Sequence, residues 1–213
     1  MSLFDLLDWF RHLDIHLKEL ATSMGPWLYV VLFAIIFCET GLVVTPFLPG
    51  DSLLFAVGAL AAVEGSPIRL TWLIPLLIFA AIAGDAVNYA CGRYIGPKVF
   101  QWENSWLFNR KHLDRAQGFY EKYGSKTIVL ARFVPIVRTF APFVAGIGQM
   151  RYSRFWLYNV VGGVTWVVFF LLLGWYFANW EIVQKNFELV VFGIVGLSIL
   201  PMIVEWWRSR IPT

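Results

Sequence analysis

Long apolar runs separated by short polar segments constrain this sequence more than any other feature. A helix that crosses the hydrocarbon core of a bilayer needs about 20 mostly apolar residues. Apolar residues make up 59% of the 213-residue chain and charged residues only 15%, against roughly 45–50% and 25% in soluble domains. One compact membrane domain therefore explains the chain better than a soluble fold. Four stretches are predicted to span the membrane: Pro26–Val44, Leu70–Gly92, Phe155–Ala178 and Leu189–Val204.

Two further apolar stretches, residues 45–62 and 127–150, carry residues that an ordinary spanning helix avoids. Proline costs a helix interior about 3 kcal/mol, and a central charge costs about 2.5–3.5 kcal/mol on insertion scales. Interrupted backbone at membrane depth is tolerated where protein or a water-filled cavity surrounds it. We therefore expect two re-entrant hairpins that enter from opposite faces, as an inverted repeat requires. Their hinges are expected at Pro46, Pro49, Gly50, Pro135 and Gly146.

The distribution of charge predicts the orientation of the chain. Residues 93–126 form a basic loop, which the positive-inside rule places in the cytoplasm. Residues 1–22 carry apolar side chains at helical spacing and predict an N-terminal amphipathic helix. A single membrane domain then covers residues 23–207, with a cytoplasmic tail at 208–213 and both termini inside. The predicted fold is an all-α, multi-pass membrane protein with about four transmembrane helices and two opposed hairpins.

Charged residues inside the apolar stretches are the candidate functional residues. Intramembrane ionisable side chains usually pair with one another or line a cavity. The two arginines of the second hairpin, Arg132 and Arg138, carry planar guanidinium groups that suit a phosphate ligand. Glu39 and Asp51 are predicted to exchange protons, because a buried carboxyl group can titrate near neutral pH. A purely structural role, in which the charges pair to hold the hairpins together, stays open.

Other polar residues of the sequence allow two interpretations each. Asp85, Asn88 and Tyr89 share one helical face, which predicts either lining of the substrate site or close helix packing. His12 and His16 are spaced i,i+4, a spacing that suits a metal ion. An amphipathic helix needs a polar face in any case, so we expect no metal site there. Neither a cofactor nor a nucleic-acid partner is expected.

Four short motifs follow one another along the chain in the order of the DedA signatures. They are Glu39–Leu42 (ETGL), Pro46–Asp51 (PFLPGD), Gly84–Tyr89 (GDAVNY) with Gly92-Arg93, and Arg132–Thr139 (RFVPIVRT) with Ala145-Gly146. The chain thus resembles the bacterial DedA family, relatives of the SNARE-associated or VTT-domain lipid scramblases. The resemblance implies lipid translocation in the inner membrane, dependence on the proton gradient, and essential roles for Glu39, Asp51, Arg132 and Arg138. Undecaprenyl phosphate is the favoured lipid, with phosphatidylethanolamine second.

Three classes of function compete at the level of the sequence, and a fourth, a structural or interaction protein, would explain the spans but not the buried charges. In the first, a non-enzymatic flippase binds a phosphate-headed lipid through Arg132, Arg138, Asp85, Asn88 and Tyr89. The second is a proton-coupled exporter of small cations or drugs, for which acidic residues alone would suffice. The third is an enzyme, a membrane lipid phosphatase or protease, but the sequence has no HExxH or GxSxG motif. Direction of transport and oligomeric state, a homo-oligomer included, stay open.

Overall fold

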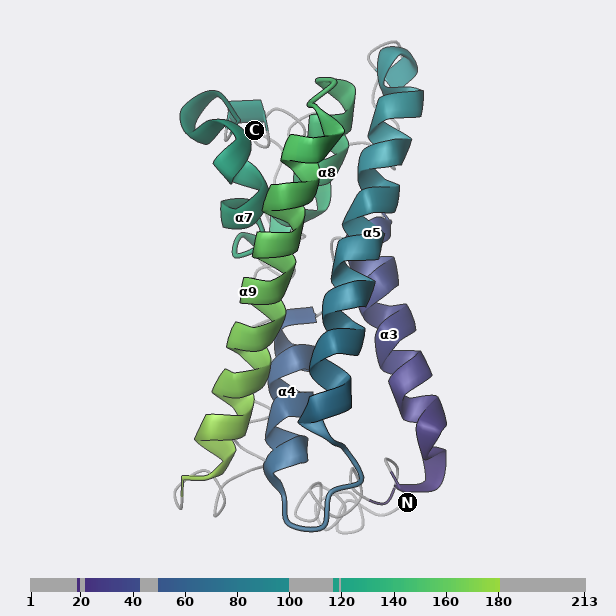
Figure 1. The fold of residues 1–213 in the computed structure, drawn as a ribbon, viewed down its shortest axis with the longest axis vertical. Coiled ribbons are helices and arrows are strands. Elements are labelled where there is room, and N and C mark those ends of the chain that lie inside the picture. Colours follow the sequence, from purple (N-terminus) through teal and green to yellow (C-terminus); the bar gives the residue numbers. More distant parts are fainter. Residues whose placement is uncertain (1–18, 20–21, 43–49, 100–116, 119, 181–213) are drawn as a thin grey trace, which may run out of the picture. The chain divides into compact units, whose positions relative to one another are not determined.

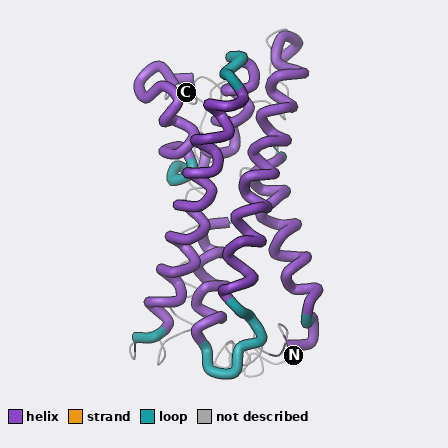
Figure 2. The backbone as a smooth tube through the Cα atoms, viewed as in Figure 1, coloured by secondary structure: helices purple, strands orange, loops and turns teal. Residues whose placement is uncertain are grey.

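The described part of the chain is entirely helical. The computed structural model describes residues 19, 22–42, 50–99, 117–118 and 120–180, and within these ranges Figure 2 shows helices and loops but no strand. The expected all-α class is confirmed for these residues. The elements in chain order (Figure 1) are α3 (Pro26–Gly41), α4 (Gly50–Ala62), α5 (Leu70–Val99), the 3-10 turn η1 (Gly124–Lys126), α7 (Thr127–Ala131), α8 (Pro135–Ile147) and α9 (Tyr152–Ala178).

Two of these helices are long and apolar enough to cross a membrane. They are Leu70–Tyr94 within α5, with 25 residues, and α9, with 27 residues. The helices predicted over Leu70–Gly92 and Phe155–Ala178 are therefore confirmed. The first predicted span contains α3, which is shorter at 16 residues. The run Leu189–Val204 lies outside the described residues, so the count of four spans stays a prediction.

The surface of α9 is apolar where a water-soluble helix would be polar. Its exposed face carries large hydrophobic side chains, whereas its buried face includes the polar Asn159. Soluble proteins bury such polar residues less often than apolar ones, and membrane proteins turn them toward the protein interior. The distribution supports a membrane environment for this helix. The exposed apolar side chains are Trp156, Leu157, Val161, Val164, Phe169, Leu172, Trp175 and Tyr176.

The described residues divide into two compact units. The first unit takes its described residues from within Leu32–Leu48 and Pro75–Val167, and the second takes its described residues from within Met1–Val31, Pro49–Ile74 and Val168–Thr213. In the second unit, α4 and the end of α9 approach closely at glycines. A Cβ added at Gly58 would lie 2.9 Å from the carbonyl carbon of Leu171, and one added at Gly174 would lie 2.8 Å from that of Phe55. Small residues at such crossings let helix backbones touch.

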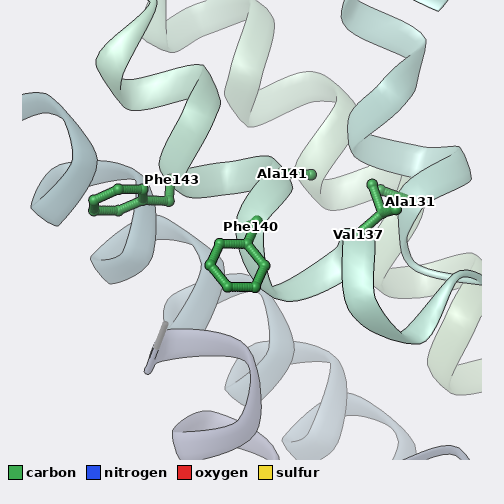
Figure 3. Packing of buried hydrophobic residues seen from close by; sticks show 5 residues of the cluster. All are labelled: Ala131, Val137, Phe140, Ala141 and Phe143. Atoms are coloured by element: carbon green, nitrogen blue, oxygen red, sulfur yellow. The ribbon is translucent and has the colours of Figure 1, made fainter. Parts of the chain in front are cut away.

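The stretch predicted as the second hairpin is a broken helix. Its first part, α7, ends at Ala131, and α8 begins at Pro135, whose missing N–H is harmless at the first helical position. Figure 3 shows the apolar cluster that holds the two pieces together; its buried members are Ala131, Val137, Phe140, Ala141 and Phe143. The helix is thus interrupted just before Pro135, and the role of Pro135 as a hairpin hinge stays a prediction. Re-entry into the membrane stays a prediction for residues 127–150.

The other predicted boundaries are met only in part. The described portion of residues 45–62 is the single helix α4, which begins at Gly50, while Pro46 and Pro49 lie outside the described residues. The basic loop expected from residue 93 begins as helix instead, because α5 continues to Val99. The helix continues through Arg93 and Tyr94, whose side chains are exposed. His12 and His16 also lie outside the described residues.

Candidate functional site

Arg138 and Glu39 form a buried ion pair between two helices of the first unit. Arg138 is in the first turn and a half of α8, and Glu39 is near the end of α3. The Nη2 atom of Arg138 donates a hydrogen bond to Oε1 of Glu39, and the two side chains are only 9% and 1% exposed. The pair joins residues 99 positions apart in the sequence.

Arg132 and Asp85 form a second buried ion pair in the same unit. Arg132 lies in the break between α7 and α8, and its Nη2 atom is 2.5 Å from Oδ2 of Asp85 in α5. The same Nη2 donates to Oδ1 of Asn159 in α9 at 2.7 Å. Asn159 in turn donates from Nδ2 to the carbonyl oxygen of Ile82 at 3.0 Å. Arg132 therefore touches α5 and α9 at once.

The two arginines face the same indole ring. The guanidinium carbon of Arg132 lies 5.9 Å from the ring centre of Trp166, and that of Arg138 lies 5.6 Å from it. A cation over an aromatic face within about 6 Å is attracted by the ring quadrupole. Trp166 is only 1% exposed. We name Glu39, Asp85, Arg132 and Arg138 the charge cluster; Trp166 is its shared aromatic wall.

Glycines let the helices that carry the charge cluster approach one another. A Cβ added at Gly84, next to Asp85, would lie 2.8 Å from the carbonyl oxygen of Phe37 in α3. That spacing is too short for any side chain, so α3 and α5 can cross here only with glycine. A Cβ added at Gly162 would lie 3.0 Å from Nε of Arg132. Glycine in α9 thus leaves room for the guanidinium group.

Asn88 ties together the backbones on either side of the Arg138–Glu39 pair. Its Nδ2 atom donates to the carbonyl oxygens of Thr40, at 3.0 Å, and Thr139, at 2.9 Å. Each carbonyl belongs to the residue directly after a member of the pair. Asn88 is fully buried. The structure therefore brings Asn88 to the pair through backbone contacts, which fix where Glu39 and Arg138 meet.

Tyr89 lies in a different environment from Asp85 and Asn88. Its hydroxyl donates to the carbonyl oxygen of Met150 and accepts a hydrogen bond from Nη1 of Arg93 at 3.2 Å. Its ring stacks on Phe155 with ring centres 4.3 Å apart. These contacts all go to residues outside the charge cluster, so the structure shows Tyr89 in helix packing. Its predicted substrate contact stays a prediction.

Tyr120 approaches the cluster from the segment that precedes η1. Its hydroxyl donates to the carbonyl oxygen of Ala141 in α8 at 2.9 Å. Burial raises the pKa of Tyr120, and the negative charge of Asp85 raises it further. The phenol is thus a neutral hydrogen-bond donor at physiological pH.

The remaining predicted residues are placed as follows. Asp51 lies in the first turn of α4, in the second unit, and its proton exchange stays a prediction. Pro135 opens α8, and Gly146 packs on α5, where an added Cβ would lie 2.7 Å from the backbone nitrogen of Arg93. Gly146 therefore packs closely on α5 near the end of α8, and its role as a hinge stays a prediction. Within the described ranges, no three His, Cys, Asp or Glu side chains gather as a metal site would need.

Sequence reasoning missed Asn159 and Trp166. Asn159 carries a signal that the sequence does offer, because it is a lone amide within a long apolar helix, and polar residues inside membranes are functional candidates. Trp166 carries no such signal, since tryptophan is common throughout this chain. Only its contact with both guanidinium groups distinguishes it.

Comparison with known proteins gives matches over nearly the whole chain. The family model described as VTT domain matches residues 48–176. The Escherichia coli protein named DedA is 53% identical over 208 residues, covering 98% of this chain and 95% of that protein. An uncharacterized membrane protein of Mycobacterium tuberculosis is 43% identical over 174 residues, covering 82% and 76%. The Escherichia coli inner membrane protein YqjA is 33% identical over 202 residues, covering 88% of each. No solved structure matches the chain.

Proposed function

Because the chain belongs to the DedA family of VTT-domain membrane proteins, we propose that it is a transporter that flips a phosphate-headed lipid across the bacterial inner membrane. The lipid crosses without chemical change, driven by the proton gradient. Undecaprenyl phosphate is the favoured substrate and phosphatidylethanolamine the second candidate. The name of the relative YqjA, an inner membrane protein, supports the location.

The observation that carries the proposal is the pair of buried guanidinium groups on one indole ring. Arg132 and Arg138 both lie within 6 Å of the Trp166 ring centre, at 5.9 and 5.6 Å. Arginine binds phosphate through two parallel hydrogen bonds, which lysine cannot reproduce. Buried ion pairs contribute little net stability, because desolvation offsets their attraction. Two such pairs side by side are therefore better explained by a ligand than by stability.

The charge balance of the cluster supports proton coupling. Glu39 and Asp85 neutralise Arg138 and Arg132 one for one. A phosphate group that enters must displace a carboxylate from its arginine. Protonation neutralises that carboxylate, which then no longer competes with the phosphate for the guanidinium group. A phosphomonoester carries about −1.5 to −2 charges at pH 7, so it requires more proton uptake than a phosphodiester does. Protonation of Glu39, which releases Arg138, is the proposed coupling step, and Asp51 is proposed as the second proton-sensitive acid.

The proposed topology has four spans, two opposed re-entrant hairpins and both termini in the cytoplasm. The lengths of α5 and α9 support two of the spans. The helix break between Ala131 and Pro135 supports the second hairpin, since interrupted helices at membrane depth line substrate sites in transporters.

The other two function classes fit this site less well. A cation exporter needs carboxylates that can reach a cation, but Glu39 and Asp85 each contact an arginine. A phosphatase needs a nucleophile or a general acid at the phosphate. The partners recorded for the two arginines include carboxylate and amide oxygens and an indole ring, a set that suits binding and positioning of a phosphate.

The test is transbilayer movement of labelled lipid in vesicles that contain the purified protein. Undecaprenyl phosphate and phosphatidylethanolamine are compared with undecaprenol, which lacks the phosphate. Arg132→Lys and Arg138→Lys are each expected to keep near-normal expression and to lower transport at least about tenfold, the cost of one charged hydrogen bond. Arg154→Lys, at an exposed position of α9, is the matched control. Wild-type rates in both lysine variants, or equal binding of undecaprenol, would overturn the proposal.

A further inference from the structure

Asn159 completes a ring of contacts around Arg132. The two hydrogens of Arg132 Nη2 go to Asp85 Oδ2, at 2.5 Å, and to Asn159 Oδ1, at 2.7 Å. Asn159 closes the ring through its bond to the carbonyl oxygen of Ile82, which lies one turn before Asp85 on α5. Asn159 is 0% exposed. Its amide orientation follows from these two partners, because only Nδ2 can donate to a carbonyl and only Oδ1 can accept from a guanidinium.

The ring of contacts around Arg132 determines which of its nitrogen atoms a ligand can bind. Nε is buried, has no hydrogen-bond partner among the described residues, and packs against Gly162, where an added Cβ would lie 3.0 Å away. Nη2 has both hydrogens engaged. Nη1 is the remaining nitrogen of the guanidinium group, since Nε packs against α9 and Nη2 is bonded to Asp85 and Asn159. Asn159 thereby holds the second hydrogen of Nη2, which leaves Nη1 as the nitrogen that can donate to a headgroup.

We propose that Asn159 is a positioning residue that fixes Arg132 as the immobile half of the headgroup site, an inference that rests on the proposed function. Arg138, by contrast, has the more exposed side chain of the two, 9% against 5%. Because Asp85 and Asn159 both hold its Nη2, Arg132 supplies a stationary donor at Nη1 while Arg138 exchanges Glu39 for the headgroup. Asn159 touches Arg132 and Ile82 and acts on the lipid only through Arg132.

The substitution Asn159→Asp makes this role depend on pH. A protonated carboxyl group has the shape of the amide: its O–H can donate to Ile82 and its carbonyl oxygen can accept from Arg132. An ionised carboxylate repels the Ile82 carbonyl and adds a second anion against Arg132. The charged groups around position 159 are Arg132, its partner Asp85, and the Arg138–Glu39 pair, whose charges also act on Arg132; the neutral phenol of Tyr120 lies near Asp85.

The experiment measures the KM and maximal rate for labelled undecaprenyl phosphate in vesicles across a pH series, per amount of folded protein. For Asn159→Asp, the ratio of its KM to the wild-type KM should be near one at acidic pH and rise to about tenfold as the new carboxyl group ionises. Asn159→Leu should show about a tenfold ratio at every pH. Thr165→Val removes an exposed hydroxyl of the same helix and should leave the ratio at one.

A merely structural Asn159 would lower the yield of folded protein while the surviving protein keeps the wild-type KM at every pH. A flat ratio near one for Asn159→Asp overturns the positioning role, even if Asn159→Leu cannot be recovered folded. Transport by the wild-type protein distinguishes a wrong role for Asn159 from a wrong proposed function. If wild type moves no phosphate lipid, the proposed function is wrong and the inference falls with it; if wild type transports and the ratio stays flat, only the role of Asn159 is wrong.

Discussion

Replacing Trp166 tests whether one ring organises both arginines. Leucine and phenylalanine both leave a smaller side chain than tryptophan, so each variant loses packing. Only phenylalanine keeps an aromatic face for the guanidinium groups. The difference between Trp166→Phe and Trp166→Leu therefore isolates the cation–π contribution from the packing contribution.

The magnitude follows from the two distances at the ring. Each guanidinium carbon lies within 6 Å of the ring centre, at 5.9 and 5.6 Å, and a desolvated cation–π contact contributes about 0.5–2 kcal/mol. Two contacts sum to about 1–4 kcal/mol. Since about 1.4 kcal/mol corresponds to a factor of ten, Trp166→Leu should bind the phosphate lipid roughly tenfold more weakly than Trp166→Phe.

The assay pairs lipid transport with unfolding in mixed micelles, followed by circular dichroism. Trp156→Leu is the matched control, because Trp156 lies on the same helix with 45% of its surface exposed. We expect Trp156→Leu to keep wild-type transport and Trp166→Phe to keep more of it than Trp166→Leu. Equal transport and equal stability of the two Trp166 variants would refute a shared aromatic wall.

Two further predictions concern protons and topology. Glu39→Gln or Asp51→Asn should remove the pH dependence of transport while folded protein stays in the membrane, because neither amide can exchange a proton. Unchanged pH dependence in both variants would exclude the proton role. Loss of folding would favour structural pairing. Cysteine labelling should place Lys111 and Arg208, both outside the described residues, in the cytoplasm and Lys185 outside the cell. Finding Lys111 and Lys185 on the same side would contradict the four-span topology.

The ion pairs also link helices, so a structural role has to be separated from transport. Arg138–Glu39 joins α8 to α3, and Arg132–Asp85 joins the α7–α8 break to α5. Lysine keeps the charge of arginine but not its planar fork. If the ion pairs only held helices together, Arg138→Lys would keep much of the stability of the protein, and the folded variant would transport lipid at the wild-type rate. Loss of transport with normal folding distinguishes the ligand role.

Several features could be predicted from the sequence because they depend on residues that are close together in the chain. Hydropathy identified the helices over Leu70–Gly92 and Phe155–Ala178, because the membrane requirement for apolar length acts on contiguous residues. Proline identified the break before α8, since its missing N–H and fixed φ act on the adjacent turn. Glu39, Arg132 and Arg138 stood out in the sequence as charged residues within apolar segments. Removing an ionised group from water costs free energy whichever residue later pairs with it, so this signal needs no knowledge of the partner.

The sequence left open which residues meet. Asp85 and Arg132 are 47 positions apart, and Glu39 and Arg138 are 99 apart, so their pairing depends on how the helices cross. The crossing depends in turn on glycines such as Gly84 and Gly162, whose missing side chains matter only against a specific neighbour.

The contacts of Asn159 and Trp166 with the arginines became visible only through tertiary structure. Both residues lie in a helix that hydropathy predicts as a plain span, and neither is charged. By itself the sequence determined that this protein is helical, apolar and charged within its apolar segments, because those properties are set residue by residue. The tertiary structure alone decided that one amide and one indole contact the arginines, because such contacts arise only when α9 packs against the helices that carry the charges.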